Sequence, residues 1–283
     1  MAYPEGAEAE AMPPEYYSGG QGITSKLKNN LEGIVPLILI IIIVAFLGDA
    51  LGFWEIPFIS SKKPINMLII GAPSYDTQTV LNNIKNIVRY QQRDATKFTV
   101  NPEEVLAQYD IVMLDQHTQA NKEISIQLGD AIKKYVNKGG KFILVMDSGI
   151  REKGAYDVIG WGATIGDIVP VACVPTGETN EPSCTQLIRV LGVLKRDKFD
   201  HPIMKFIEQA PVEGEGQILF ETFPVEITGE QLAYIERTGP SGDWYPGIVE
   251  KKLYIGKSIY FNYDPGKTPG IFERTIKYLA GKS

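Results

Sequence analysis

Two short phrases of this 283-residue chain combine the residue types that hydrolases use for nucleophilic catalysis. Asp147 and Ser148 follow one apolar run, and His117 stands two residues after Asp115, which ends another. A serine hydroxyl next to a histidine base and a carboxylate can attack a carbonyl carbon. Residues 146–150 read MDSGI rather than Gly-x-Ser-x-Gly, so Ser148, Asp147 and His117 are candidate catalytic residues without the usual local signature.

Polar residues also follow the first apolar run of the chain. Ser74 and Asp76 stand there, as Asp115, Asp147 and Ser148 do after later runs. Open parallel sheets bind ligands at the carboxyl ends of their strands, so these five residues are a candidate ligand-binding set. The alternative is that they are caps and turn residues, which strand ends need in any case.

Composition excludes several other kinds of site. With two histidines and two cysteines, the chain shows no metal-ligand spacing, and we expect neither a metal nor a cofactor. The glycine-rich phrase at residues 160–166 does not follow the first strand, as a dinucleotide-binding loop would. A net charge of −6 argues against binding to nucleic acid, which needs a basic surface.

The two cysteines, Cys173 and Cys184, flank a stretch rich in Pro, Gly and Thr that is typical of an exposed loop. Two cysteines placed in this way favour a disulfide and an oxidising compartment. Two unrelated reduced thiols are the alternative.

The elements that position these residues alternate between strand and helix. Continuous apolar runs at Asn66–Gly71, Tyr109–Leu114 and Lys141–Met146 predict strands that are buried on both faces. Helical spacing of apolar residues predicts helices at Thr77–Tyr90 and Ile124–Val136. This order is typical of a parallel sheet covered by helices. The remaining predicted elements are strands at Lys97–Val100, Leu187–Leu194, Ile218–Phe223, Gln231–Arg237 and Lys257–Tyr263, and a helix at Gly270–Ala280.

An apolar segment stands ahead of these elements. Residues 33–48 contain no charge, and the 22 residues 33–54 would span ~33 Å as a helix, enough for a bilayer core of ~30 Å. We expect a transmembrane helix at 33–54, behind a flexible Pro/Gly/Tyr-rich tail at 1–32 and before a neck at 55–64. A buried helix or a cleaved signal are the alternatives. The prediction is a single-pass protein of the cell membrane in contact with lipid, with the tail inside and the domain at 65–283 outside.

Several phrases resemble the class I glutamine-amidotransferase-like family in its non-amidotransferase branches, which include trehalose-utilisation-like and membrane-anchored accessory domains. The phrases are NMLIIG, AIKKYVNKGGKFILVMDSG, DHPI and KSIYFNYDPG followed by FERTIKYLAG. The resemblance implies an α/β fold with a three-layer, mostly parallel sheet of flavodoxin or amidotransferase type. That family carries its nucleophilic cysteine on the turn after the third of the buried strands, where this chain has Asp147, so the resemblance implies a catalytically silent domain.

Three functions follow as expectations. The first is a membrane-anchored, catalytically silent domain used for binding or assembly in a surface or envelope complex, with protein partners or copies of itself. The second is a membrane-tethered hydrolase of an envelope carbohydrate or peptide-like substrate. The third rests on Gly33–Ile38, which resembles the start of archaeal type IV pilin helices and would make the chain a filament subunit.

Overall fold

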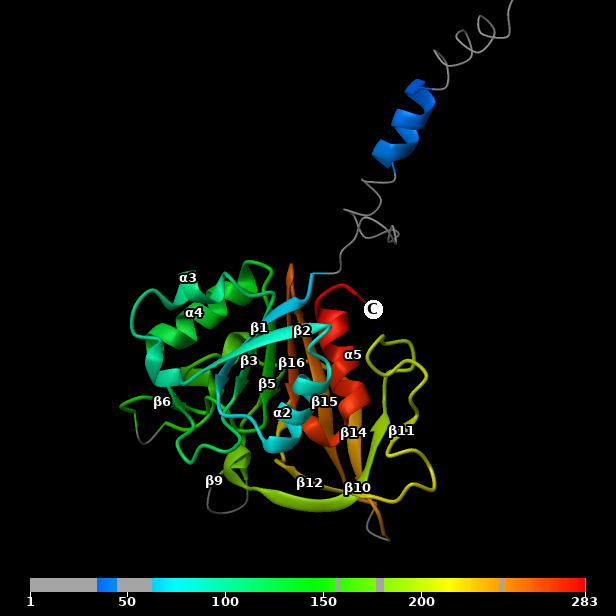
Figure 1. Cartoon of the computed structure of the whole chain (residues 1–283). Coiled ribbons are helices and arrows are strands. Elements are labelled where there is room, and N and C mark those ends of the chain that lie inside the picture. Colours follow the sequence, from blue (N-terminus) through cyan, green and yellow to red (C-terminus); the bar gives the residue numbers. More distant parts are fainter. Residues whose placement is uncertain (1–34, 45–62, 156–157, 177–180, 240–241, 283) are drawn as a thin grey trace, which may run out of the picture. The chain divides into compact units, whose positions relative to one another are not determined.

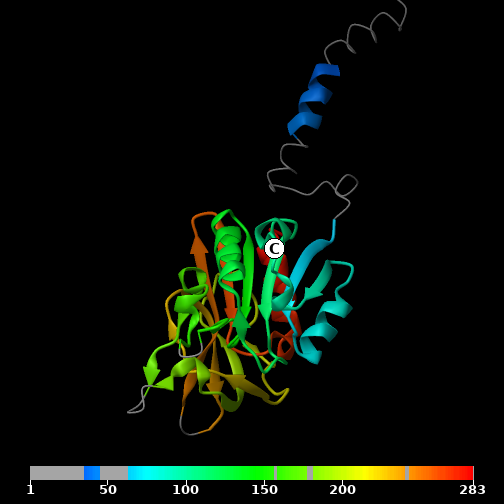
Figure 2. The ribbon, with the colours of Figure 1, turned by 90° about the vertical axis from the view of Figure 1, so that its left-hand side faces the viewer.

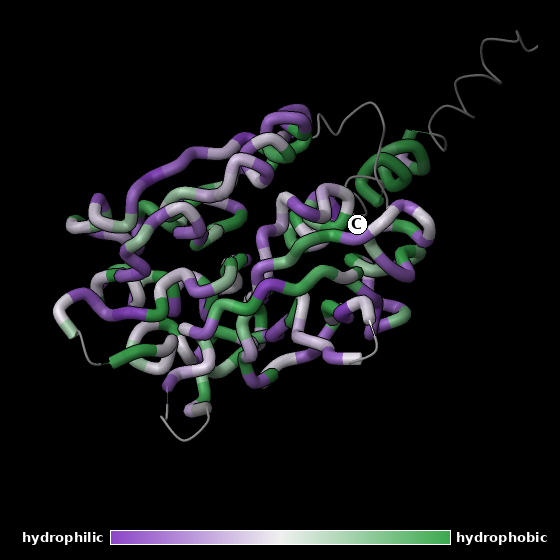
Figure 3. Tube along the Cα trace, turned by 90° about the horizontal axis from the view of Figure 1, so that it is seen from below, coloured by the Kyte–Doolittle hydropathy of each residue, from purple (hydrophilic) through white to green (hydrophobic). Residues whose placement is uncertain are grey.

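The computed structural model describes residues 35–44, 63–155, 158–176, 181–239 and 242–282. The chain divides into two units, Met1–Ser61 and Lys62–Ser283, which we describe separately. In the first unit, residues 35–44 form a helix of apolar, exposed residues, drawn green in Figure 3.

The structure does not support the predicted membrane anchor. Among the residues that the structure describes, no helix is both long and apolar enough to cross a membrane. The predictions of a transmembrane helix at 33–54 and of a single-pass location are therefore not supported. Residues 33–34 and 45–54 of that segment, the tail at 1–32 and the neck up to residue 62 lie outside the described residues.

A mixed sheet forms the centre of the second unit (Figure 1). In the described ranges, ten strands join in the order β11-β10-β14-β15-β16-β5-β3-β1-β2, with β12 paired to β10. The strands are β1 (Ile65–Gly71), β2 (Val88–Arg93), β3 (Ile111–Asp115), β5 (Lys141–Val145), β10 (Ile188–Arg196), β11 (Gln209–Ala210), β12 (Ile218–Thr222), β14 (Glu230–Arg237), β15 (Trp244–Leu253) and β16 (Gly256–Phe261). Two-residue strands pair outside this sheet: β4 (Glu123–Ile124) with β6 (Arg151–Glu152), β7 (Val171–Ala172) with β13 (Glu226–Ile227), and β8 (Pro175–Thr176) with β9 (Glu181–Pro182).

The parallel half of the sheet consists of β2, β1, β3, β5 and β16. Its central strands are almost wholly buried, as their continuous apolar runs predict. Helices α3 (Pro102–Leu106) and α4 (Ile126–Asn137) pack together on one side, and α2 (Tyr75–Asn83) and α5 (Pro269–Leu279) on the other (Figures 1 and 2).

Two predicted elements of this half are wrong. The helix expected over Thr77–Tyr90 ends at Asn83, and the strand expected at Lys97–Val100 is replaced by a 3-10 turn at Ala95–Lys97. The second strand is instead β2, at the edge of the sheet. Its polar residues are exposed and only Val88 is buried, so its sequence lacks the apolar run of an inner strand.

The antiparallel half corrects the predicted three-layer, mostly parallel sheet. Each neighbouring pair along β16, β15, β14 and β10 is antiparallel, and so is the pair of β12 and β10. The ten-residue strand β15, which links β14 to β16, was not among the predicted elements. Along β10, buried and exposed residues alternate, which is typical of an antiparallel sheet with one face open to solvent.

The antiparallel half lies beside the carboxyl ends of the parallel strands, since β10 runs along that end of the domain (Figure 1). Asn262, directly after β16, fixes this arrangement. Its Nδ2 donates to the carbonyl oxygens of Phe223 at 2.8 Å and Pro246 at 2.9 Å, and its Oδ1 accepts from the Phe223 N–H at 3.1 Å. All of these groups are buried, so the bonds hold the segment after β12 next to the end of β16.

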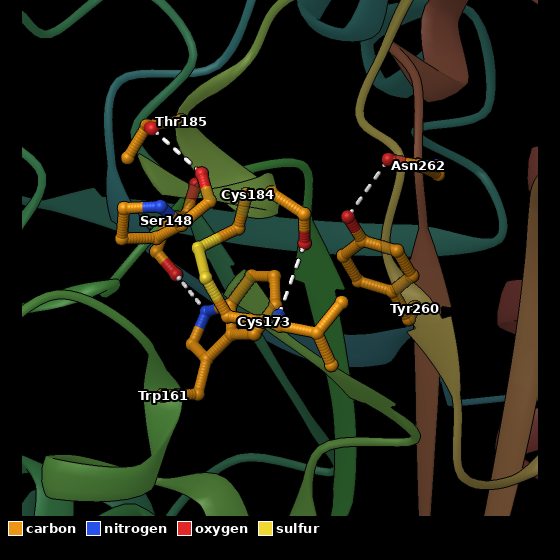
Figure 4. Close-up of a disulfide and its surroundings, with 10 residues drawn as sticks. Ser148, Trp161, Cys173, Cys184, Thr185, Tyr260 and Asn262 are labelled. Carbon is orange, nitrogen blue, oxygen red and sulfur yellow. Dashed lines mark hydrogen bonds between the residues drawn. A yellow bond between two sulfur atoms is a disulfide. The ribbon is translucent and has the colours of Figure 1, made fainter. Parts of the chain in front are cut away.

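The predicted disulfide between Cys173 and Cys184 is present, with its Cα atoms 5.2 Å apart. It lies next to Trp161, whose indole N–H donates to the Ser148 carbonyl at 2.9 Å (Figure 4). Trp161 also packs edge-to-face on Tyr260 of β16, with ring centroids 5.7 Å apart. The disulfide thus closes the loop from Cys173 to Cys184 beside Trp161, and Trp161 in turn packs on the sheet.

Candidate functional site

A cavity of about 450 Å³ opens at the carboxyl ends of β1, β3 and β16. This is the edge at which open parallel sheets bind ligands. Three of the predicted site residues, Ser74, Asp76 and His117, contribute to its lining. The full lining is Ser74, Tyr75, Asp76, His117, Thr118, Leu219, Phe220, Glu221, Tyr263, Asp264 and Lys267.

Ser74 and Asp76 are placed by the start of α2. The Ser74 hydroxyl accepts a hydrogen bond from the Thr77 N–H at 2.9 Å and so caps this helix. Asp76 forms an ion pair with Lys267 at 2.7 Å. Both residues thus have a structural role at the rim of the cavity, as the alternative reading of the sequence allowed.

Asp115 is the last residue of β3, and its side chain is fully buried. One carboxyl oxygen accepts from the His117 N–H at 2.9 Å, whereas the other has no hydrogen-bond partner among the described residues. Burial raises the pKa of Asp115 to about 7, against an ordinary value of 3.8, and the nearby carboxylates of Asp264 and Asp147 act in the same direction. Asp115 is therefore a carboxyl group that gains or loses its proton near neutral pH.

Ser148 and Asp147 do not contribute to the cavity lining. The Ser148 side chain is buried, and its hydroxyl oxygen accepts from the Gln116 N–H at 2.8 Å. Asp147 forms an ion pair with Lys122 at 3.2 Å. These bonds join the turn after β5 to the turn after β3, which is a structural use of both side chains.

The residue with the strained backbone after β5 is Met146. Its φ of 51° lies in the left-handed region, which costs a residue other than glycine ~1–2 kcal/mol. α/β-hydrolases place their nucleophile at such a sharp turn after a strand. The Met146 sulfur lies 3.1 Å from Nδ1 of His117. In a hydrolase, the nucleophilic atom would lie at this distance from the nitrogen of the catalytic base.

The residues that the C-terminal half contributes to the site were not among the predicted site residues. Tyr263 and Asp264 follow β16, and the Asp264 carboxylate accepts from Thr77 Oγ1 at 2.7 Å and from the Gly266 N–H at 2.9 Å. An aspartate directly after a predicted strand is the signal that identified Asp115 and Asp147, and it was available for Asp264 as well. For Leu219 and Glu221 there was no comparable signal, because nothing local to β12 indicates that it reaches the cavity.

Among the residues that the structure describes, no group of three or more His, Cys, Asp or Glu side chains is arranged to hold a metal ion. The cavity carboxylates have other partners: Asp76 pairs with Lys267, Glu221 pairs with Arg189, and Asp264 accepts from the Thr77 hydroxyl and the Gly266 N–H.

Comparisons with known proteins give a fold likeness and no family. No model of a protein family matches the chain, and no curated protein matches it. Among solved structures, a cold-adapted β-galactosidase from Rahnella sp. R3 is similar with a TM-score of 0.50 and 11% identity over 76% of this chain. A β-galactosidase from Bacillus circulans sp. alkalophilus is similar with the same TM-score and identity over 75% of this chain. The matches cover 31% and 30% of those enzymes, so this chain corresponds to less than a third of their length.

These findings correct the expected family. The resemblance to the class I glutamine-amidotransferase-like family is not supported, because no family model matches and the two solved structures above are β-galactosidases. At 11% identity the likeness concerns the fold alone. The phrases that carried the resemblance are buried strands and helix ends, which unrelated sheets also require.

Proposed function

We propose that the unit Lys62–Ser283 is a binding domain without catalytic turnover, which acts in assembly with a protein partner through its strand-end cavity. The supporting observation is the Met146 side chain at the strained turn beside His117. Nucleophilic catalysis needs a hydroxyl, thiol or amine that a base can deprotonate. A thioether has no such proton, so the position holds the geometry of a nucleophile without its chemistry.

The neighbouring polar groups support the same proposal. The buried Ser148 hydroxyl is held by the Gln116 N–H, and Asp147 is paired with Lys122. Neither group is part of the cavity lining. A substrate in the cavity would therefore meet His117 without Ser148 or Asp147 beside it.

A hydrolase remains the second candidate because of Asp115. A carboxyl group with a pKa of about 7 is suited to donate a proton at neutral pH, and it lies directly before the turn that carries His117. Its full burial is the opposing observation, since a general acid must come within hydrogen-bond reach of the substrate.

Turnover assays separate the two candidates. The purified full-length chain is assayed with fluorogenic glycosides, esters and peptides, next to the variants His117→Ala, Asp115→Asn and Ser148→Ala. We expect the wild type to show no turnover above that of the variants. Turnover that is present in the wild type and lost in His117→Ala and Asp115→Asn would refute the binding-domain proposal in favour of a hydrolase.

A further inference from the structure

Strand β12 lies at an edge of the sheet, and the pairing of its neighbours determines the direction of each of its main-chain N–H and C=O groups. On its one paired side lies β10, with Val190 opposite Phe220. On the other side of β10 lies β14, and the Thr238 N–H there donates to the Leu191 carbonyl oxygen at 3.1 Å. Because main-chain groups alternate in direction along a strand, Leu191 faces β14 and Val190 faces β12.

The alternation continues into β12. Phe220, opposite Val190, directs its N–H and C=O toward β10, so its neighbours Leu219 and Glu221 direct theirs away from the sheet. Leu219 and Glu221 have no main-chain hydrogen bond to any other described segment. The free edge of β12 therefore presents two donors and two acceptors in the spacing of a strand.

The strand-end cavity runs along this free edge. Three consecutive residues of β12, Leu219, Phe220 and Glu221, line it. Side chains of consecutive strand residues point to opposite faces, so a cavity that touches all three lies beside the edge and not over one face. The lining also includes Ser74–Asp76 at the start of α2 and Lys267. The cavity is thus a trough with an open strand edge along one side.

The side chains of the trough favour a particular partner. The lining holds three carboxylates, Asp76, Glu221 and Asp264, and one ammonium group, that of Lys267. Arg189, outside the lining, pairs with Glu221 at 3.0 Å, so these five groups together carry one net negative charge. Apolar groups stand beside these charges, since Tyr75 is 80% exposed and Leu219 is 55% exposed. This combination is complementary to a chain that carries basic and apolar side chains.

We propose that an extended segment of a partner protein, carrying basic and apolar residues, adds to β12 as a further strand of the sheet. The proposal rests on the proposed function, of which it names the partner and the mode of binding. Strand addition derives its affinity from main-chain hydrogen bonds to a free edge. Folded proteins protect exposed edges with charged side chains, especially Lys, or with Pro. Ile218–Thr222 contains no Lys or Pro, and its one charged residue, Glu221, is paired with Arg189 on β10.

The trough also selects an extended segment over a second copy of this domain. A second copy would bring its own β10 and core behind its β12, and a cavity of about 450 Å³ is too small for those elements. A single strand needs only the ~4.8 Å that separates neighbours in a sheet.

The test is a selection of random heptapeptides displayed on phage, with the full-length chain as target and its Leu219→Pro variant for counter-selection. Proline removes the outward N–H of Leu219 and leaves the bonds between β12 and β10 in place. Enriched peptides are synthesised and their Kd is measured with the wild type, Leu219→Pro and the matched control Leu219→Ala, which keeps the N–H. We expect Leu219→Pro to weaken binding about tenfold or more, and Leu219→Ala by less than about threefold.

Modified peptides test the same contact from the partner side. The peptide amides fall into two alternating sets, of which only one faces β12. N-methylation of the set that faces β12 should abolish binding, and N-methylation of the other set should be tolerated. Amide hydrogen exchange should slow at Leu219 and Glu221 when the peptide binds, and this readout holds even if the proline variant fails to fold. Absence of enriched peptides, or peptides that bind Leu219→Pro as tightly as the wild type and tolerate N-methylation in both registers, would overturn the proposal. Turnover assays would be unaffected by that result, so failure of strand addition is distinguishable from failure of the proposed function.

Discussion

Replacing Asp115 by Asn should remove most of the pH dependence of stability between pH 5 and pH 9. In the folded chain burial raises the pKa of Asp115 to about 7, whereas in the unfolded chain it returns to about 3.8. The folded state therefore holds the proton more tightly, and its stability falls as pH rises from about 4 to about 7 and stays lower above. Asparagine has the shape of the protonated acid and does not ionise.

The magnitude follows from the two pKa values. The difference between a pKa of about 7 and one of 3.8 corresponds to a total loss of ~4 kcal/mol in the free energy of unfolding as pH rises. Roughly 3 kcal/mol of this loss occurs between pH 5 and pH 9. For a domain of this size that equals a decrease in Tm of ~8 °C. We expect this decrease in the wild type, and a much smaller one in Asp115→Asn, whose Tm at pH 5 should be near that of the wild type.

The assay is thermal and urea unfolding of both proteins at pH 5, 7 and 9. Asp130→Asn is the matched control, since Asp130 lies exposed on α4 in an ion pair with Lys133 at 2.8 Å. This control should retain the full decrease. Parallel curves for the wild type and Asp115→Asn would refute the reasoning, because they would show that the buried carboxyl does not titrate in this range.

Three further predictions concern single contacts. Tyr278→Phe removes the hydrogen bond from the Tyr278 hydroxyl to the buried Glu250 carboxylate at 2.8 Å, and should lower the free energy of unfolding by about 2 kcal/mol in urea titrations near pH 7. Burial raises the pKa of Glu250, but hydrogen bonds from His201 and Tyr278 outweigh it and leave the pKa below 4.5, so this contribution should be lost as pH falls below about 4.5. Cys173→Ser with Cys184→Ser opens an 11-residue loop and should cost about 3 kcal/mol, with a change in Trp161 fluorescence; equal stability of the oxidised and doubly substituted proteins would contradict this. Gly71→Ala should lower the free energy of unfolding by ~3 kcal/mol or more, because Gly71 has a φ of 112° and a Cβ there would overlap the Asp115 carbonyl. A Tm within 2 °C of the wild type would correspond to a loss of only ~1 kcal/mol and would count against that geometry.

The parallel half of the fold could be predicted because its signals are local. The apolar runs before Gly71 and Asp115 and at 141–145 are long enough to indicate strands buried on both faces. The disulfide was predictable because two cysteines flank a loop-like stretch. Polar residues after buried strands also gave Ser74, Asp76 and His117, which the structure brings to one cavity.

The antiparallel half could not be predicted because its signals are long-range. Strand β15 contains Pro246 and Gly247, which argue against a strand in local terms, yet neighbours on both sides stabilise it. Edge strand β2 was mistaken for the end of a helix, because its exposed residues carry no strand pattern. The resemblance put the nucleophile position of that family at Asp147, whereas the residue with a positive φ directly after β5 is Met146.

The antiparallel half changes what the carboxyl ends of the parallel strands can bind. In an open parallel sheet that edge presents loops and side chains, which suit a small ligand. Here β10 and β12 bring a strand edge to the same place, so that the free N–H and C=O groups of Leu219 and Glu221 border the cavity that Ser74–Asp76 also line. Main-chain groups in strand spacing recognise another main chain, and the side chains around them add the preference for particular residues. The thioether of Met146 beside His117 and the open edge of β12 therefore support a single proposal for this cavity, the binding of an extended polypeptide.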